Sequence, residues 1–345
     1  MTERVVKLNK GECIGEATEA EHLDDSEDSQ CISKIKTESD PSNQKLPQHL
    51  QQLYEKSNKH LLEDQNQQLY SLLLEFSDVF AKDEFDLGSF SDIEHEIETG
   101  DARPIKQRMR RVPRCFENEE KGHLDKLESA GIIEPSNSEW ASAPVLVSKR
   151  DGSIRWCIDY RKLNTVTKND VYPLPLIDQC LDTLAGNQWF SKLDANSAYY
   201  QIKIKVSDRP KTAFTTKYGL FQFVRMSFAL CNAPGTYARV MNLVLRGLTW
   251  NIVLAFLVDI FVMDKTFDDH LRNLRIVFDS FRTYGLKLKP RKCDLFKEEV
   301  VFLGRKVDKT EISMGDHTDE YVEAIRNWPT PTTTKQVEQF LGFAN

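Results

Sequence analysis

The residues AFLVDIFV at positions 255–262 form an apolar strand–turn–strand pattern, and an amphipathic helical pattern lies on each side of it in the chain. The upstream helix, predicted at 232–248, begins with Asn232 as its cap and carries apolar residues at helical spacing. The downstream helix, predicted at 266–284, ends at Gly285. One strand precedes the first helix and another follows the second. This order of strand, helix, hairpin, helix and strand predicts an antiparallel sheet backed by two helices, which is an α+β arrangement.

Further strands and one helix are predicted upstream of this unit. Residues 141–160 indicate two strands around an Asp-Gly turn. Residues 188–206 are β-rich, with Asp194 at the end of the first strand, and residues 211–226 predict another strand pair. An amphipathic helix is predicted within residues 115–133.

Charge divides the chain of 345 residues into an acidic front and a mildly basic body. Residues 1–103 contain ten Lys/Arg and 24 Asp/Glu, whereas the remaining residues contain 36 and 29. Residues 1–48 are acidic, Ser-rich and predicted to be a disordered leader, and residues 49–94 are predicted to form short helices and a linker. A basic body favours a polyanionic partner, although a mildly basic domain behind an acidic linker explains the same charges without one.

Several classes of protein are disfavoured by composition. We find no apolar run long enough to cross a bilayer, so no membrane partner is expected. The N-terminus, MTERVVKLNKGE, lacks the hydrophobic core of a secretion signal. The seven cysteines form no CxxC pair, which favours a reduced intracellular compartment over a disulfide framework or a zinc site.

Two acidic residues stand where metal-dependent chemistry could occur. Asp194 ends a predicted strand, and Asp259 lies on the turn of the predicted hairpin. Enzymes that add nucleotides use two Mg²⁺ ions to neutralise the triphosphate and the attacking hydroxyl, and Mg²⁺ prefers carboxylate oxygens. Taken alone, however, an aspartate at a strand end is usually a turn-former, and spacing does not decide between the two roles.

From about residue 95 onward, the chain resembles the reverse transcriptase of gypsy-type LTR retrotransposon Pol polyproteins. The matching stretches occur in order: TGDARPIKQRMRRVP, AGIIEPSNSEWASAPVLVSKRDGSIRWCIDYRKLN, FSKLDANSAYYQIKI, KTAFTTKYGLFQF, MSFALCNAPGTYARVMN, FLVDIFV and LKLKPRKCDLFKEEVVFLG. The resemblance implies a right-hand polymerase with fingers and palm over residues 95–310. It also implies a truncated start of the thumb and connection over 311–345, within a fragment of a longer polyprotein.

The resemblance assigns roles around the reacting groups. It places the first metal-binding aspartate at Asp194, with the carbonyl of Ala195 beside it, and another at Asp259. Lys149 and Arg155 fall where the fingers grip the incoming triphosphate, a task that suits a lysine charge and a planar guanidinium. Both are alternatively ordinary charges beside a hairpin. The implied cofactor is a pair of Mg²⁺ ions, with Mn²⁺ as a substitute.

Other implied roles concern the sugar, template and primer. Tyr199 falls on the aromatic residue that excludes a ribose 2′-hydroxyl, although a core aromatic is the plain alternative. Phe228 and Ala229 lie in the segment that closes over the nucleotide, where the family usually has glycine at the second position. Arg161 would contact the template. The stretch Val301–Gly304 resembles the primer-gripping hairpin, with Phe302, Leu303 and Gly304 as its nucleic-acid-binding residues.

One residue departs from the family pattern. The hairpin motif is aromatic-x-Asp-Asp, so Val258 stands where the leading aspartate is expected. Asp264 is five positions further along a strand that rises about 3.3 Å per residue, so we expect it to be out of reach. We therefore expect an RNA-directed DNA polymerase domain with impaired catalysis, taking dNTPs and an RNA or DNA template–primer. The alternatives are a catalytically dead nucleic-acid-binding module and a decayed product without a stable fold. By family analogy we expect a cytoplasmic location, with the nucleus as the alternative.

Overall fold

The computed structural model describes residues 45–148, 154–314, 323 and 325–344. The chain divides into two units, Met1–Asn43 and Gln44–Asn345, and every element described below belongs to the second. The predicted leader, residues 1–48, lies outside the described residues except for its last four positions. Within the described residues, no helix combines the length and the apolar character that crossing a bilayer requires.

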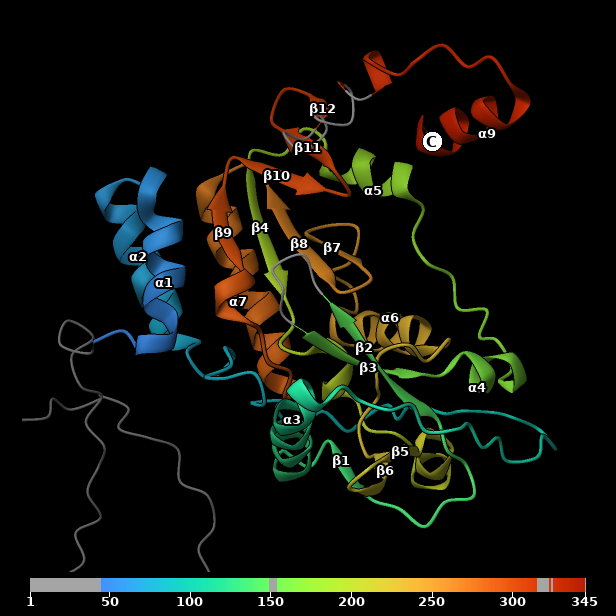
Figure 1. Ribbon diagram of the computed structural model, residues 1–345. Coiled ribbons are helices and arrows are strands. Elements are labelled where there is room, and N and C mark those ends of the chain that lie inside the picture. The colour runs from blue at the N-terminus through green and yellow to red at the C-terminus, as the bar shows by residue number, and fades with distance from the viewer. Residues whose placement is uncertain (1–44, 149–153, 315–322, 324, 345) are drawn as a thin grey trace, which may run out of the picture. The chain divides into compact units, whose positions relative to one another are not determined.

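A four-stranded antiparallel sheet carries the candidate site (Figure 1). Its strand order is β7 (Val253–Phe256), β8 (Asp259–Asp264), β4 (Trp189–Asp194) and β9 (Asp294–Lys297). The chain passes from β4 through α6 (Ala233–Val244) to the β7–β8 hairpin, and then through α7 (Phe267–Thr283) to β9. The predicted antiparallel sheet backed by two helices is confirmed.

Strand β8 shows how this sheet is held between two layers. Successive side chains of a strand point to opposite faces. Ile260 and Val262 pack with apolar residues of α6 and α7. Phe261 and Met263 face the other way and pack with α5 (Ile177–Leu184), β10 (Glu299–Phe302) and β11 (Arg305–Asp308). The strand is therefore buried on both faces, which fixes its register and so the place where its first residue lies.

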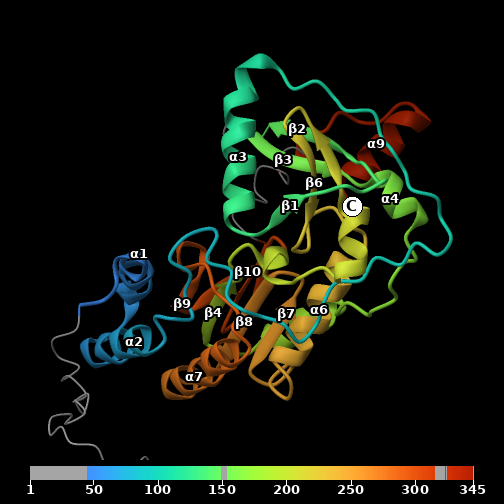
Figure 2. The same ribbon diagram turned by 90° about the horizontal axis from the view of Figure 1, so that it is seen from below.

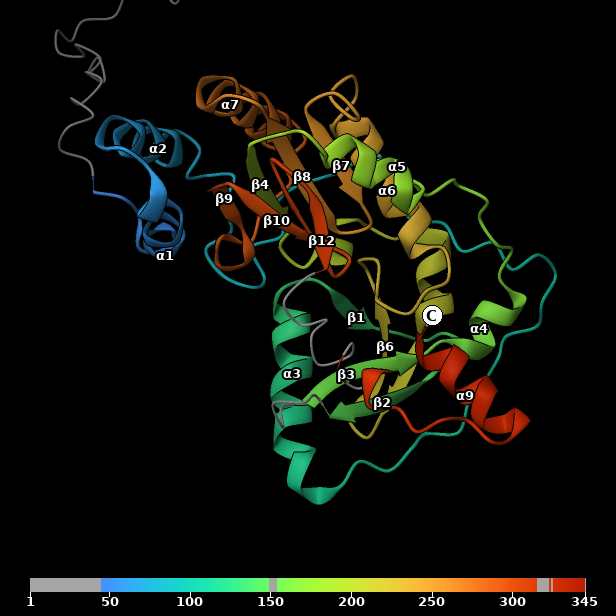
Figure 3. The ribbon, with the colours of Figure 1, turned by 90° about the horizontal axis from the view of Figure 1, so that it is seen from above.

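The remaining elements surround this sheet (Figures 2 and 3). Helix α3 lies near the small antiparallel sheet β1-β6-β5 and the β2–β3 hairpin in both views. A third sheet has the order β10-β11-β12. The bounds not yet given are α1 (Gln48–Ser57), α2 (Glu63–Glu75), α3 (Glu117–Ser129), α4 (Arg161–Val166), α9 (Thr334–Ala344), β1 (Ile133–Pro135), β2 (Ala143–Ser148), β3 (Ile154–Asp159), β5 (Phe214–Thr216), β6 (Gly219–Phe223) and β12 (Ile312–Met314).

Two local predictions differ from the structure. The β-rich pattern at 188–206 forms a strand only as far as Asp194, after which the chain turns through Ser197 at φ 47° into a short 3-10 helix, Ala198–Gln201. Asn232 does stand at the start of α6, but its side chain makes no capping bond. Its amide instead accepts from the N–H of Asp170 and donates to the carbonyl of Lys168.

The buried histidine His95 gives the fold a predictable acid sensitivity. Its ring lies 2.8 Å from the Thr236 hydroxyl, and burial, opposed by nearby carboxylates, lowers its pKa from 6.5 to about 4. The fold therefore tolerates only the neutral ring, so this contribution is complete above pH 6.5 and is lost as the pH falls towards 4. At pH 5 the loss should be about 2 kcal/mol.

Urea unfolding at pH 7 and pH 5 measures this loss. We expect His95→Gln to show a smaller drop in stability between the two pH values than the unchanged chain. The matched control is His60→Gln, at an exposed histidine, which should keep the full drop. Equal pH dependence in the two variants would contradict the assignment.

Candidate active site

Asp194 and Asp259, hereafter the acid pair, face each other at the ends of β4 and β8. Directly opposed residues of an antiparallel pair project from the same face of the sheet. Both side chains are half-buried, so they remain open to a ligand. The structure thus brings together the two carboxylates that the sequence analysis singled out from segments 65 positions apart.

Each member of the acid pair already has a lysine partner. Lys192 Nζ lies 2.9 Å from Asp259 Oδ1, and Lys292 Nζ lies 3.4 Å from Asp194 Oδ2. Burial raises the pKa of Asp194, Lys292 opposes that rise, and the charge of Asp259 adds to it. The charges of two carboxylates and two ammonium groups balance, so a cation that binds here competes with both lysines.

Val258 occupies the turn between β7 and β8, directly before Asp259. Its half-buried side chain packs against the apolar core that includes α6 and α7. The preceding residue, Leu257, has φ 53°, a left-handed conformation that costs a non-glycine residue about 1–2 kcal/mol. The turn is therefore tight, and the Val258 side chain offers no oxygen to a metal ion.

Asp264 lies at the other end of β8, opposite Trp189. Its carboxylate binds two buried side chains, with 2.8 Å to His270 Nδ1 and 2.6 Å to Asn273 Nδ2. The residue is committed to this network and does not replace the carboxylate that Val258 lacks.

An aromatic cluster adjoins the acid pair. Tyr199 lies in the 3-10 helix that follows β4, and its ring meets Phe228 edge-on with centroids 5.3 Å apart. The ring of Tyr237, from α6, also meets Tyr199 edge-on, with centroids 5.8 Å apart. Ala229 has φ 69°, a conformation that favours glycine, as the family pattern at this position would provide. Ala195, directly after Asp194, is buried.

The predicted triphosphate residues are described only in part. Lys149 lies outside the described residues. The backbone of Arg155 lies in β3, opposite Val147 of β2, and its side chain is outside the described part of the chain. The predicted Asp-Gly turn between these strands also falls outside it. Strands β2 and β3 themselves form the predicted hairpin.

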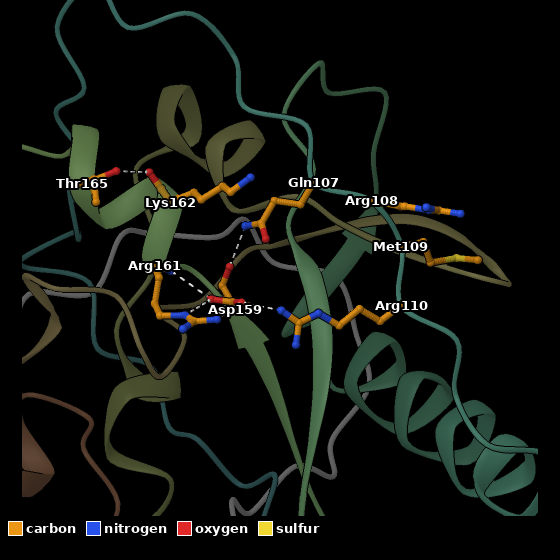
Figure 4. A pocket seen from close by; sticks show the side chains of 8 residues that line it. All are labelled: Gln107, Arg108, Met109, Arg110, Asp159, Arg161, Lys162 and Thr165. Carbon is orange, nitrogen blue, oxygen red and sulfur yellow. Dashed lines mark hydrogen bonds and ion pairs between the residues drawn. The ribbon is translucent and has the colours of Figure 1, made fainter.

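Arg161 lies at the start of α4 on a cation-lined cleft of about 510 Å³ (Figure 4). Its guanidinium donates two hydrogen bonds to Asp159, at 2.9 and 2.8 Å, and Arg110 donates a third at 3.0 Å. The Arg161 bonds hold the pKa of Asp159 down at about 2. Arg108 and Lys162 also line this cation cleft, which therefore carries more positive than negative charge.

The predicted primer hairpin is a tight turn between β10 and β11. Leu303 and Gly304 form the turn with φ values of 48° and 81°. The Leu303 side chain is 51% exposed, whereas Phe302 is buried. The Phe302 ring lies edge-on to Phe256 of β7, with centroids 5.4 Å apart. This hairpin therefore contacts the strand pair that carries Asp259.

Sequence reasoning missed the residues that neutralise and support the acid pair. Lys192 is two positions before Asp194 on the same strand, so strand periodicity could have placed it on the same face. Lys292 had no such signal, because its approach depends on the fold. Buried Asn196 donates to the backbone carbonyls of Asp83 and Asp86, which ties the loop after Asp194 to the N-terminal segment.

The site's donors suit a hard divalent cation only in part. In the portion of the chain that the structure describes, no three His, Cys, Asp or Glu residues gather in a way that could hold a metal ion. The acid pair supplies two carboxylates, and the buried hydroxyl of Tyr237 near it makes no hydrogen bond with any residue that the structure describes. Mg²⁺ commonly binds through one or two carboxylates and takes its other ligands from water and substrate phosphates. The residues fit a cation shared in that way.

A four-stranded palm sheet with two facing aspartates at the ends of β4 and β8, together with a separate β2–β3 fingers hairpin, defines a right-hand nucleic-acid polymerase fold. Residues 147–307 match the reverse transcriptase (RNA-dependent DNA polymerase) family. Residues 147–307 therefore belong to this family, in which divalent metal ions are generally used, and the relatives of the chain include Pol polyproteins of gypsy-type retrotransposons.

Two such relatives come from Drosophila melanogaster. The retrovirus-related Pol polyprotein from transposon 297 is 34% identical over 82% of this chain and 27% of its own length. The Pol polyprotein from transposon opus is 33% identical over 80% of this chain and 28% of its own length. The chain thus spans about a quarter of the length of these curated relatives.

Solved structures share the fold. The foamy viral protease–reverse transcriptase in complex with RNA/DNA hybrid has a TM-score of 0.73 at 22% identity, over 86% of this chain and 39% of that one. The same viral protein in complex with dsDNA has a TM-score of 0.76, also at 22% identity, over 86% and 61% of the two chains.

Proposed function

We propose that residues 95–310 form an RNA-directed DNA polymerase domain that adds dNTPs to a primer on an RNA or DNA template, with catalysis impaired in this chain. The observation that carries the proposal is the acid pair, in which Asp194 of β4 and Asp259 of β8 face each other. Tyr199 and the β10–β11 hairpin lie near these strands. Family membership supports the reaction. The titles of the solved neighbours, in complex with RNA/DNA hybrid and dsDNA, support the partners.

The chain's residues divide the work by place. The acid pair holds the cations, and Arg155 and Lys149 bind the incoming triphosphate. Tyr199 meets the sugar and Phe228 closes over the nucleotide. When bound, two Mg²⁺ or Mn²⁺ ions neutralise the triphosphate and lower the pKa of the attacking primer hydroxyl. Phe302, Leu303 and Gly304 hold the primer end next to the hairpin that carries Asp259.

Impairment follows from charge. Two carboxylates would hold the divalent cations, where the family has three carboxylates, and the two lysines compete for the same oxygens. A lost metal ligand removes charge stabilisation worth several kcal/mol, which is several powers of ten in rate. Binding of template and primer does not depend on that charge, because the cation cleft and the β10–β11 hairpin lie outside the acid pair.

A catalytically silent nucleic-acid-binding module is the second candidate. The ion pairs with Lys192 and Lys292 favour it, since the two lysine charges balance the two carboxylate charges when no metal ion is bound. The two candidates separate in one experiment on poly(rA)·oligo(dT), with incorporation of dTTP measured in Mg²⁺ or Mn²⁺ and binding measured by fluorescence anisotropy. Slow incorporation supports the polymerase, and binding without incorporation selects the module. Absence of binding in low salt would contradict both.

The cation cleft leads to a quantitative expectation for template binding. Arg161→Ala should weaken binding about tenfold near 0.1 M salt and make the slope of log K against log salt shallower by about 1. The loss should be the same for any sequence, since phosphate contacts carry no base information. Anisotropy titrations at several salt concentrations measure both. Lys59→Ala, at an exposed lysine before α2, is the control and should change neither. An unchanged slope in Arg161→Ala would exclude this residue from the template site.

A further inference from the structure

Tyr237 is a buried residue of α6 whose hydroxyl has no hydrogen-bond partner among the described residues. Its side chain is only 1% exposed. A buried hydroxyl that lacks a partner pays the full cost of losing water, so such groups in folded proteins usually bond to an ordered water or a ligand. The surroundings of this hydroxyl therefore indicate what its partner is.

Tyr237 lies near the acid pair, because its ring contacts Tyr199 in the 3-10 helix that follows β4. Burial raises the pKa of Tyr237, and the charges of Asp194 and Asp259 raise it further. The phenol therefore stays protonated and can donate a hydrogen bond in a region of negative charge. Neither carboxylate accepts a hydrogen bond from it. A water molecule or another small oxygen ligand would supply the acceptor that the described residues do not.

The ring of Tyr237 is held in place by packing. It is part of the buried apolar cluster against which Val258 also packs, and it makes an edge-on contact with Tyr199. A ring fixed in this way presents its hydroxyl at one position. Such a donor can orient a ligand of the acid pair, whereas a mobile donor could not.

We propose that Tyr237 is a positioning residue whose hydroxyl donates a hydrogen bond to an oxygen ligand, such as a metal-bound water, that the acid pair holds. The inference rests on the proposed function in one respect, that the acid pair binds a divalent cation. Tyr237 itself contributes no charge to the cation. It restricts where the cation's water lies, and through Tyr199 it relates that position to the nucleotide.

Direct Mn²⁺ binding tests the proposal without any catalytic assay. The amplitude of the free Mn²⁺ signal in electron paramagnetic resonance gives the dissociation constant for the unchanged chain and for Tyr237→Phe. Outer groups that orient metal ligands commonly change affinity by about 10–100-fold when removed. We expect Tyr237→Phe to weaken Mn²⁺ binding about tenfold without lowering the melting temperature. If this variant does not fold, Tyr237→Met removes the same hydroxyl.

Tyr200→Phe is the matched control. It removes the neighbouring Tyr200 phenol, whose ring contacts Phe228. Burial raises the pKa of Tyr200, and the acid pair is not among the causes of this rise. Its Mn²⁺ affinity should equal that of the unchanged chain. Equal affinity in Tyr237→Phe would overturn the proposal, and a higher melting temperature would then mark the hydroxyl as merely unpaired.

Failure of the proposed function has a different signature. If the unchanged chain binds no Mn²⁺, the comparison is repeated in a Val258→Asp background, which supplies a third carboxylate. Absence of binding in both backgrounds refutes the metal site and the role of Tyr237 together. Binding that is unaffected by Tyr237→Phe refutes the role of Tyr237 alone.

Discussion

Replacing Val258 with aspartate is expected to raise dTTP incorporation on poly(rA)·oligo(dT) by about a thousandfold. The turn places residue 258 directly before Asp259, so a carboxylate there joins the acid pair. A third carboxylate strengthens metal binding, and several kcal/mol of charge stabilisation correspond to two or more powers of ten in rate. It also shifts the balance against Lys192 and Lys292, which now neutralise three carboxylates instead of two.

Single-turnover extension in Mg²⁺ and in Mn²⁺ measures the gain, and two variants control for it. Val258→Asn has nearly the same shape as the aspartate but no charge, so it should recover little of the rate. Asp194→Asn in the Val258→Asp background should abolish the gain, because the new carboxylate acts only as part of the set. A Val258→Asp chain that folds, binds template–primer and still incorporates no more than the unchanged chain would refute the account of impairment.

The periodic parts of the fold could be predicted from sequence. The AFLVDIFV hairpin, the two helices beside it and the position of Asp194 at a strand end all follow from local spacing. The sheet that joins them then follows from the order of the elements, because antiparallel neighbours with short connections have few alternatives. The pattern was misleading at 195–206, where alternating residues form turns and a 3-10 helix. There the buried amides of Asn196 and Gln201 bind backbone carbonyls and bend the chain away from the sheet.

The electrostatics of the acid pair could not be predicted in the same way. Lys292 approaches Asp194 across almost a hundred residues, and only the packing of β9 against β4 brings it there. The unpaired hydroxyl of Tyr237 is equally invisible in the sequence, where the residue is one apolar position of an amphipathic helix. Spacing therefore indicates which carboxylates meet, but the fold decides what else surrounds them.

The short helices expected at residues 49–94 correspond to α1 and α2, which pack into the main core. Leu50, Leu69 and Leu72 are fully buried in the cluster that includes α6 and α7. Ala81 N–H donates to the carbonyl of Leu288, and Leu288 N–H donates to the carbonyl of Val79. The next residue after Leu288, Lys289, donates its N–H to the carbonyl of Asp194. Two backbone hydrogen bonds, through Leu288 and Lys289, therefore connect the segment around Ala81 to Asp194.

Phe76→Ala is therefore expected to destabilise the whole domain by about 3–5 kcal/mol, as truncation of a buried aromatic residue does. The Phe76 ring packs on Phe278 of α7 with centroids 5.5 Å apart, and Arg282 lies over its face at 4.4 Å. Urea unfolding followed by circular dichroism measures the loss, and Leu62→Ala, at a leucine that is 72% exposed, should cost less than about 0.5 kcal/mol.

The shape of the transition decides what the loss means. If residues 45–90 belong to one cooperative core, Phe76→Ala shifts a single transition to lower urea and leaves its slope unchanged, since the same surface is exposed on unfolding. If the segment were an independent linker, α1 and α2 would melt first and the sheet would keep its own midpoint. Because Asn196 and Leu288 connect this segment to the strand that ends at Asp194, the single transition also implies that template–primer binding and any incorporation are lost at the same urea concentration.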